Sequence, residues 1–102
     1  MVSWVKVAHV SDVPIGGMIQ VVIEDEPIAL YHLKDGFHAT SDVCTHAGES
    51  LTEGSLHGCI VACPKHGGKF DVTTGEATAL PCVVSIEKYS VEVREEGIWV
   101  DF

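Results

Sequence analysis

Residues 44–46 read Cys-Thr-His and residues 63–66 read Cys-Pro-Lys-His, with sixteen residues, 47–62, between the two motifs. Each motif offers one thiolate and one imidazole within a short segment. Thiolates suit iron and zinc, and imidazoles accept many transition metals. The two motifs therefore predict one metal site, with Cys44, His46, Cys63 and His66 as its candidate ligands.

A structural zinc site with two cysteines and two histidines is one interpretation of these motifs. Zinc motifs usually place their two cysteines close together and their two histidines close together, whereas here each segment contributes one of each kind. The interleaving favours a [2Fe-2S] cluster in which one iron takes both thiolates and the other takes both imidazoles. Cys59 and Cys82 match no common all-cysteine ferredoxin spacing, so we interpret them as buried small hydrophobes.

The sequence on both sides of the motifs has the pattern of β-strands, with β-branched and aromatic runs broken by Gly, Pro and Asp. We expect strands over residues 4–10, 18–24, 28–33, 37–40, 83–94 and 98–102, with turns at 25–27, 34–36 and 95–97. Residues 41–81 contain shorter apolar runs and frequent glycines. The prediction is one all-β domain over 1–102, with a base from about 1–40 and 83–102 and a loop-rich insert over about 41–82.

The charge balance excludes several partners. The chain has 102 residues, and its 15 acidic and 6 basic side chains give a net charge of -9. Such a chain repels the phosphates of nucleic acids and the surface of an anionic membrane. No apolar stretch is long enough to span a bilayer, and no signal-peptide pattern follows Met1. We therefore expect a cytoplasmic protein that is a monomer when free, with no nucleic-acid or membrane partner.

The chain resembles the Rieske family, and in particular the small soluble ferredoxins of bacterial aromatic-ring dioxygenases. The resemblance covers nearly the whole chain and rests on both metal motifs and on shared segments between and after them: Gly54-Ser55-Leu56, Gly67-Gly68-Lys69-Phe70-Asp71, Thr74-Gly75 and Pro81. It implies the Rieske fold, an antiparallel sandwich or barrel-like base with a cluster-binding subdomain.

The same resemblance implies one [2Fe-2S] cluster and assigns its ligands. Cys44 and Cys63 would hold the inner iron, and His46 and His66 would hold the outer iron near the surface. Pro81 would lie in a third loop that covers the cluster.

The chain differs from the high-potential branch of the family, which is found in respiratory bc complexes. That branch joins its two cluster loops by a disulfide at the positions of Glu49 and Lys65, and it has a serine and a tyrosine at the positions of Gly68 and Phe70. Hydroxyl donors near sulfur stabilise the reduced cluster, so their absence lowers the reduction potential. We expect a potential of about -150 mV, at the lower end of the range for such centres.

The sequence favours an electron carrier over an enzyme, because no nucleophile beside a base, carboxylate pair or phosphate-binding loop stands out. By resemblance, the donor is a flavin-containing NADH-dependent ferredoxin reductase and the acceptor is a terminal Rieske oxygenase. Three alternatives stay open: a Rieske component of a diiron monooxygenase, the small subunit of an assimilatory nitrite reductase, and a zinc-stabilised interaction module. The histidines outside the motifs are interpreted as surface or strand-edge residues: His9, His32, His38 and His57.

Overall fold

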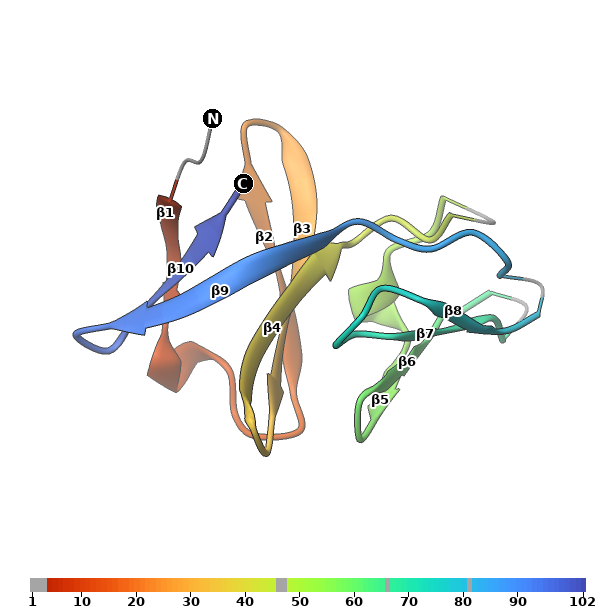
Figure 1. Cartoon of the computed structure of the whole chain (residues 1–102), viewed down its shortest axis with the longest axis horizontal. Helices are drawn as coiled ribbons and strands as arrows, with labels where there is room; N and C mark the ends of the chain where they lie inside the picture. The colour runs from red at the N-terminus through yellow and green to blue at the C-terminus, as the bar shows by residue number, and fades with distance from the viewer. Residues whose placement is uncertain (1–3, 46–47, 66, 81) are drawn as a thin grey trace.

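The computed structural model describes residues 4–45, 48–65, 67–80 and 82–102, which form two antiparallel β-sheets with no α-helix among them (Figure 1). The larger sheet has six strands: β1 (Trp4–His9), β2 (Met18–Ile23), β3 (Glu26–Leu33), β4 (Gly36–Ser41), β9 (Lys88–Arg94) and β10 (Gly97–Asp101). The smaller sheet has four strands: β5 (Ser55–His57), β6 (Ile60–Ala62), β7 (Lys69–Asp71) and β8 (Ala77–Ala79). Two short 3-10 turns, η1 (Val10–Asp12) and η2 (Leu51–Glu53), complete the regular structure. No helix in this part of the chain could cross a membrane.

The larger sheet takes strands from both ends of the chain, in the order β1-β10-β9-β4-β3-β2. The β9-β10 hairpin lies between β1 and β4, so the last two strands connect the first strand to the rest of the sheet. The two edge strands, β1 and β2, also contact each other, and the sheet therefore curls toward a barrel. The all-β class and the barrel-like base that were expected from the sequence are confirmed.

Acidic residues form two of the hairpin turns. Glu24 and Asp25 have φ angles of 49° and 68° between β2 and β3, and Glu95 and Glu96 have φ angles of 48° and 67° between β9 and β10. Two consecutive positive φ angles match the twist that a two-residue hairpin requires. The turn expected at 25–27 is therefore misplaced: the turn is formed by residues 24–25, because Glu26 and Pro27 already pair with Ile23 and Val22 across the sheet.

The expected strand over 83–94 is too long, because β9 begins at Lys88. Residues 83–87 connect the two sheets instead. The Ile86 N–H donates to Gly75 O beside the smaller sheet at 2.8 Å, and Glu87 O accepts from the Ser41 N–H at the end of β4 at 2.9 Å. These two backbone groups have partners beside the smaller sheet and at the end of β4, so they are hydrogen-bonded without strand pairing.

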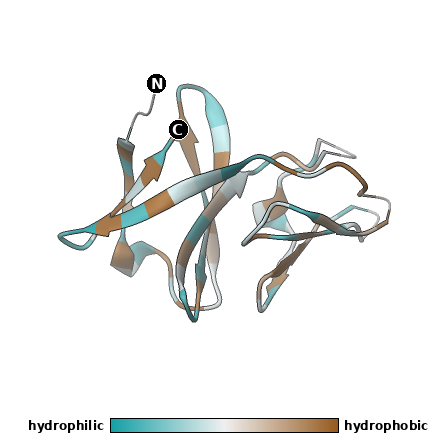
Figure 2. Cartoon of the chain, in the orientation of Figure 1, coloured by the Kyte–Doolittle hydropathy of each residue, from teal (hydrophilic) through white to brown (hydrophobic). Residues whose placement is uncertain are grey.

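The buried apolar side chains form two hydrophobic cores. One lies inside the curled larger sheet, where apolar positions alternate with polar ones along β9 (Figure 2) and Ile98 and Val100 of β10 are fully buried. The other lies between the sheets and includes Tyr31, Phe70 and three cysteines. The second core supports the loops that follow β4, β6 and β8.

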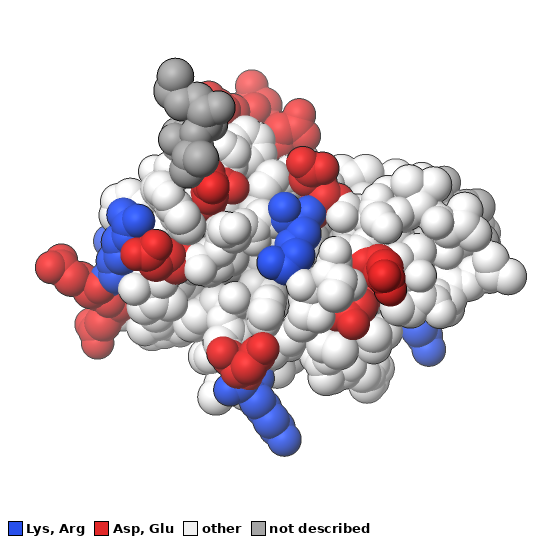
Figure 3. All heavy atoms as spheres, viewed as in Figure 1, with Lys and Arg blue, Asp and Glu red and all other residues white. Residues whose placement is uncertain are grey.

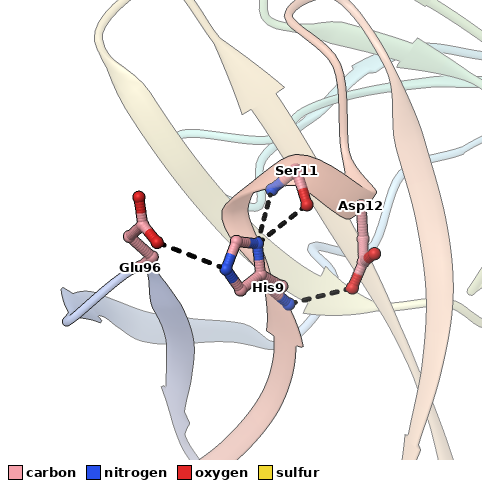
Figure 4. Close-up of polar contacts among 4 residues, drawn as sticks. All are labelled: His9, Ser11, Asp12 and Glu96. Atoms are coloured by element: carbon pink, nitrogen blue, oxygen red, sulfur yellow. Dashed lines mark hydrogen bonds and ion pairs between the residues drawn. The ribbon is translucent and has the colours of Figure 1, made fainter.

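His9 is the N-cap residue of η1 and lies where β1 ends (Figure 4). Its Nδ1 accepts from the Ser11 N–H at 3.1 Å and lies 2.8 Å from Ser11 Oγ, and its own backbone N–H donates to the Asp12 carboxylate at 2.9 Å. Its Nε2 lies 3.6 Å from Glu96 Oε2 in the β9-β10 turn. The imidazole thus joins the first strand to the last hairpin, and His9 is exposed at the end of β1, as expected.

Candidate metal centre

Two loops with matching backbone hydrogen bonds contain Cys44 and Cys63, the two cysteines of the predicted site. In loop 1 (residues 44–49) the Cys44 N–H donates to Glu49 O at 2.9 Å, and in loop 2 (residues 63–68) the Cys63 N–H donates to Gly68 O at 2.7 Å. Gly48 and Gly67, each four residues after its cysteine, have φ angles of 70° and 71°. Glycine adopts this left-handed conformation without a steric penalty, so each loop can reverse sharply after its metal motif.

Asp42 anchors loop 1 to the larger sheet. Its carboxylate is fully buried and accepts from Gln20 Nε2 at 2.6 Å, from the Thr52 N–H at 2.8 Å and from the Ser50 hydroxyl. All of these partners donate, which suits an ionised carboxylate. Asp42 was not among the residues expected from the sequence to build the site, although an aspartate two positions before Cys44 with Ser50 and Thr52 nearby was a visible signal.

Three of the four cysteines are buried close together. Cys44, Cys63 and Cys82 are 1%, 4% and 3% exposed, and Cys82 Sγ lies 3.6 Å from Cys44 Sγ. All four cysteines are among the described residues, and none of them forms a disulfide. Cys59 is only partly buried and lines a separate surface cavity with Ile15.

Burial controls the acidity of these thiols. Loss of hydration raises the pKa of Cys63, the neighbouring Cys44 raises it further, and the Lys65 backbone N–H acts in the opposite direction. Burial also raises the pKa of Cys82 to about 12, with Cys44 again adding to the effect. A thiolate in this place therefore needs a compensating positive charge, which a bound metal supplies.

The described residues fit the sulfur half of a [2Fe-2S] site with two thiolate and two imidazole ligands. Cys44 and Cys63 come from separate loops, are shielded from water and lie near each other. His46, His66 and Pro81 lie outside the described residues. Within the described part of the chain, no three Cys, His, Asp or Glu side chains form a cation site.

Two side-chain contacts join the loops around the buried cysteines. Lys65 Nζ of loop 2 lies 3.6 Å from Glu49 Oε1 of loop 1, so an ion pair occupies the positions at which the high-potential branch has its disulfide. Thr45 Oγ1 donates to Val84 O at 2.8 Å, which attaches loop 1 to loop 3 (residues 80 and 82–86). The ion pair is partly exposed and contributes about 0–1 kcal/mol.

Loop 3 presents an apolar surface. Leu80, Val83 and Val84 are 77%, 72% and 61% exposed. Figure 3 shows groups of charged side chains scattered over the visible face of the larger sheet, while the end that carries the loops is mostly uncharged. The candidate site therefore lies beside the exposed apolar side chains of loop 3, on a protein whose net charge is strongly negative.

Histidines outside the motifs have structural contacts or lie in the solvent. His32 Nδ1 lies 2.7 Å from Val13 O, and its ring stacks on Phe37. His38 Nε2 lies 3.0 Å from Asp35 Oδ1, and His57 is exposed at the end of β5. His9 and His57 are exposed as expected, whereas His32 and His38 are partly buried on β3 and β4, which are inner strands of the larger sheet.

Comparisons with known proteins give a consistent family. The Rieske [2Fe-2S] domain matches residues 3–90. Ferredoxin CarAc of Metapseudomonas resinovorans is 42% identical over 98 residues, which cover 95% of this chain and 92% of that protein. The ferredoxin component of the naphthalene 1,2-dioxygenase system of Pseudomonas putida is 33% identical over 100 residues, which cover 98% of this chain and 96% of that protein.

Among solved structures, a chain in the complex of reduced oxygenase and oxidized ferredoxin in carbazole 1,9a-dioxygenase has a TM-score of 0.90 at 41% identity, covering 96% of this chain and 92% of that one. The expected Rieske fold is thereby confirmed. The family and sequence matches together show that the chain belongs to the Rieske [2Fe-2S] family, as a small ferredoxin whose cofactor is one [2Fe-2S] cluster.

Proposed function

We propose that this chain is the electron carrier of a bacterial aromatic-ring dioxygenase system in the cytoplasm. It would accept single electrons from a flavin-containing NADH-dependent reductase and deliver them to the terminal oxygenase, without catalysing the oxygenation itself. The proposal is supported by similarity over almost the full chain to ferredoxins of such systems. A Rieske cofactor is incompatible with the zinc-stabilised module that the sequence left open.

The ligand assignment is part of the proposal. Cys44 and Cys63 would bind the inner iron through their sulfur atoms, and His46 and His66 would bind the outer iron through their imidazoles. The observation that carries it is the burial of Cys44 and Cys63 in neighbouring loops of matched construction. The cluster, when bound, supplies reversible storage of one electron.

The residues of the chain would hold this centre in a fixed, water-poor place and leave one side accessible. Asp42 and its hydrogen-bond donors keep loop 1 against the larger sheet. Lys65 and Glu49 join the loops at the surface. The exposed apolar side chains of loop 3 offer a small area to a docking partner, which suits a brief encounter.

The first test is to purify the chain after expression with an adequate iron supply. We expect about two iron and two sulfide ions per chain, a visible spectrum that bleaches on reduction, and an EPR signal in the reduced state. His66→Ala should abolish this signal and electron delivery. His57→Ala is the matched control, because His57 is exposed and lies outside the metal motifs.

A His66→Ala protein that still reduced its oxygenase at the normal rate would contradict the ligand assignment. Reconstitution with purified reductases and oxygenases tests the assignment of the system. Delivery of electrons only to a diiron monooxygenase or to a nitrite reductase would replace the dioxygenase proposal while leaving the carrier role intact.

A further inference from the structure

The Cys82 thiol lies in direct contact with a proposed cluster ligand. Cys82 is 3% exposed, and its Sγ lies 3.6 Å from Cys44 Sγ, a sulfur-to-sulfur separation that permits a weak S–H hydrogen bond. It reaches this place from loop 3, the connection that follows β8 in Figure 1. From the sequence alone, Cys82 was expected only to be a buried small hydrophobe.

Gly68 lies against this thiol and leaves room for it. A side-chain carbon on residue 68 would overlap Cys82 Sγ and would lie 3.2 Å from Cys82 Cβ. Gly68 O also accepts the Cys63 N–H, so this glycine is adjacent to the second cysteine. The thiol therefore fills the space that the missing side chain of Gly68 leaves beside both sulfur ligands.

The direction of the Cys44 contact follows from the proposed ligand role, on which this inference rests. A cysteine that binds iron is a thiolate and has no proton to donate. The remaining proton in the pair is on Cys82, so the Cys82 S–H donates and Cys44 Sγ accepts. A hydrogen bond to an ionised acceptor is stronger than one between neutral groups.

We propose that Cys82 is a positioning residue that raises the reduction potential of the cluster through this hydrogen bond. Adding an electron increases the negative charge on the ligand sulfur atoms, so a donor aimed at one of them stabilises the reduced state more than the oxidised state. Cys82 thereby sets how readily the carrier accepts an electron and how readily it gives the electron up.

The test compares midpoint potentials of purified, cluster-loaded variants, measured by redox titration with visible and EPR detection. Cys82→Ala removes the donor and should lower the potential. Cys82→Ser retains a donor and should have a potential above that of Cys82→Ala. Cys59→Ala is the matched control, because it removes a thiol that lies in the separate cavity with Ile15, and its potential should equal that of the wild type.

A second set of variants tests the contact from the side of residue 68. Gly68→Ala displaces the Cys82 thiol and should also lower the potential. In the Cys82→Ala background the same substitution should lower it much less, because the donor is already absent. This non-additivity would identify the contact between the two positions.

The proposal is overturned if loaded Cys82→Ala has the wild-type potential, or if Cys82→Ser and Cys82→Ala have the same potential. If Cys82→Ala fails to retain its cluster, Gly68→Ala and Cys82→Ser decide, and wild-type potential in Gly68→Ala counts against the proposal. Failure of the function proposed above would look different, because the wild-type protein itself would then lack the [2Fe-2S] spectrum or would not deliver electrons to the oxygenase, whatever the order of the variants' potentials.

Discussion

Asp42 shows how one side chain connects the sheet to the metal loops. It lies at the end of β4, and its carboxylate takes hydrogen bonds from β2 through Gln20 and from the η2 region through Ser50 and Thr52. Tyr31 lies nearby, with its hydroxyl 3.0 Å from Thr40 Oγ1, and burial raises the pKa of that tyrosine. The Asp42 cluster and the Tyr31–Thr40 pair are thus two separate groups of polar side chains in an otherwise apolar region.

We predict that Asp42→Ala destabilises the loaded protein by about 1–3 kcal/mol, because the part-buried donors at Ser50 and Thr52 lose their acceptor, whereas the exposed Gln20 amide can bind water instead. Asp42→Asn should fall between Asp42→Ala and the wild type, since an amide oxygen can still accept some of these bonds. The thermal unfolding midpoint and the rate at which the visible absorbance disappears measure the effect. Glu53→Ala, at an exposed position in η2, is the control. Equal behaviour of Asp42→Ala and this control would contradict the anchoring role.

At the scale of elements, Gly54 sets the distance between η2 and the β5-β6 hairpin. A side-chain carbon at this position would overlap the Ala62 carbonyl oxygen, and the Leu51 carbonyl oxygen would lie only 3.2 Å away. Both obstacles are backbone atoms, which cannot rotate out of the way. Only glycine fits at this position, because any side-chain carbon would collide with these backbone atoms.

We predict that Gly54→Ala lowers the thermal unfolding midpoint far more than Gly58→Ala. Gly58 has a φ of 61° and no neighbouring atom within 4 Å of an added carbon, so the control should cost only about 1–2 kcal/mol of backbone strain. For a domain near this size, each 1 kcal/mol corresponds to about 4–8 °C. Similar midpoints for the two variants would show that the hairpin can move away from η2.

The stability of the turn between β7 and β8 should depend on pH through Asp71. The Thr73 hydroxyl and N–H donate to Asp71 Oδ1 at 2.6 and 2.9 Å, and they hold the pKa of this carboxyl below its usual value of 3.8. Because the pKa is lower in the folded state, the stabilisation is present above the unfolded pKa and disappears as the pH falls through the folded pKa.

Thr73→Ala should therefore be less stable than the wild type near neutral pH, and this difference should shrink as the pH falls below about 4. Urea unfolding at a series of pH values measures the difference in the free energy of unfolding. Thr73→Ser retains both donors and should follow the wild type. A difference between Thr73→Ala and the wild type that stayed constant across this range would argue against the role of the carboxylate.

At the scale of the whole molecule, the net charge of -9 should guide its encounters with partners. If the partners present basic surfaces, attraction accelerates association at low ionic strength. We predict that the second-order rate of electron transfer to the oxygenase falls as salt rises from about 0.01 M to about 0.1 M, since the screening length decreases from about 30 to about 10 Å. Stopped-flow measurement of cluster oxidation provides the rate. An unchanged rate would mean that apolar contacts at loop 3 dominate recognition.

The local patterns in the sequence were sufficient for much of the fold and for the cofactor class. Alternating apolar residues predicted the strands of the larger sheet, because burial of one sheet face imposes that period. The prediction failed over residues 83–87, where valines that resemble a strand lie exposed in loop 3. Hydrophobic residues alone do not distinguish a strand from an apolar surface loop.

The sequence by itself determined the β class and the paired Cys/His motifs, since both depend on spacing within a few residues. Only the tertiary structure decided which distant groups meet: Asp42 with Gln20, Glu49 with Lys65, and Cys44 with Cys82. The physical reason is that these contacts depend on how two sheets and three loops pack, and spacing along the chain contains no such information. The Cys82 thiol illustrates the difference, because its contact with Cys44 depends on a fold that brings together residues 38 positions apart.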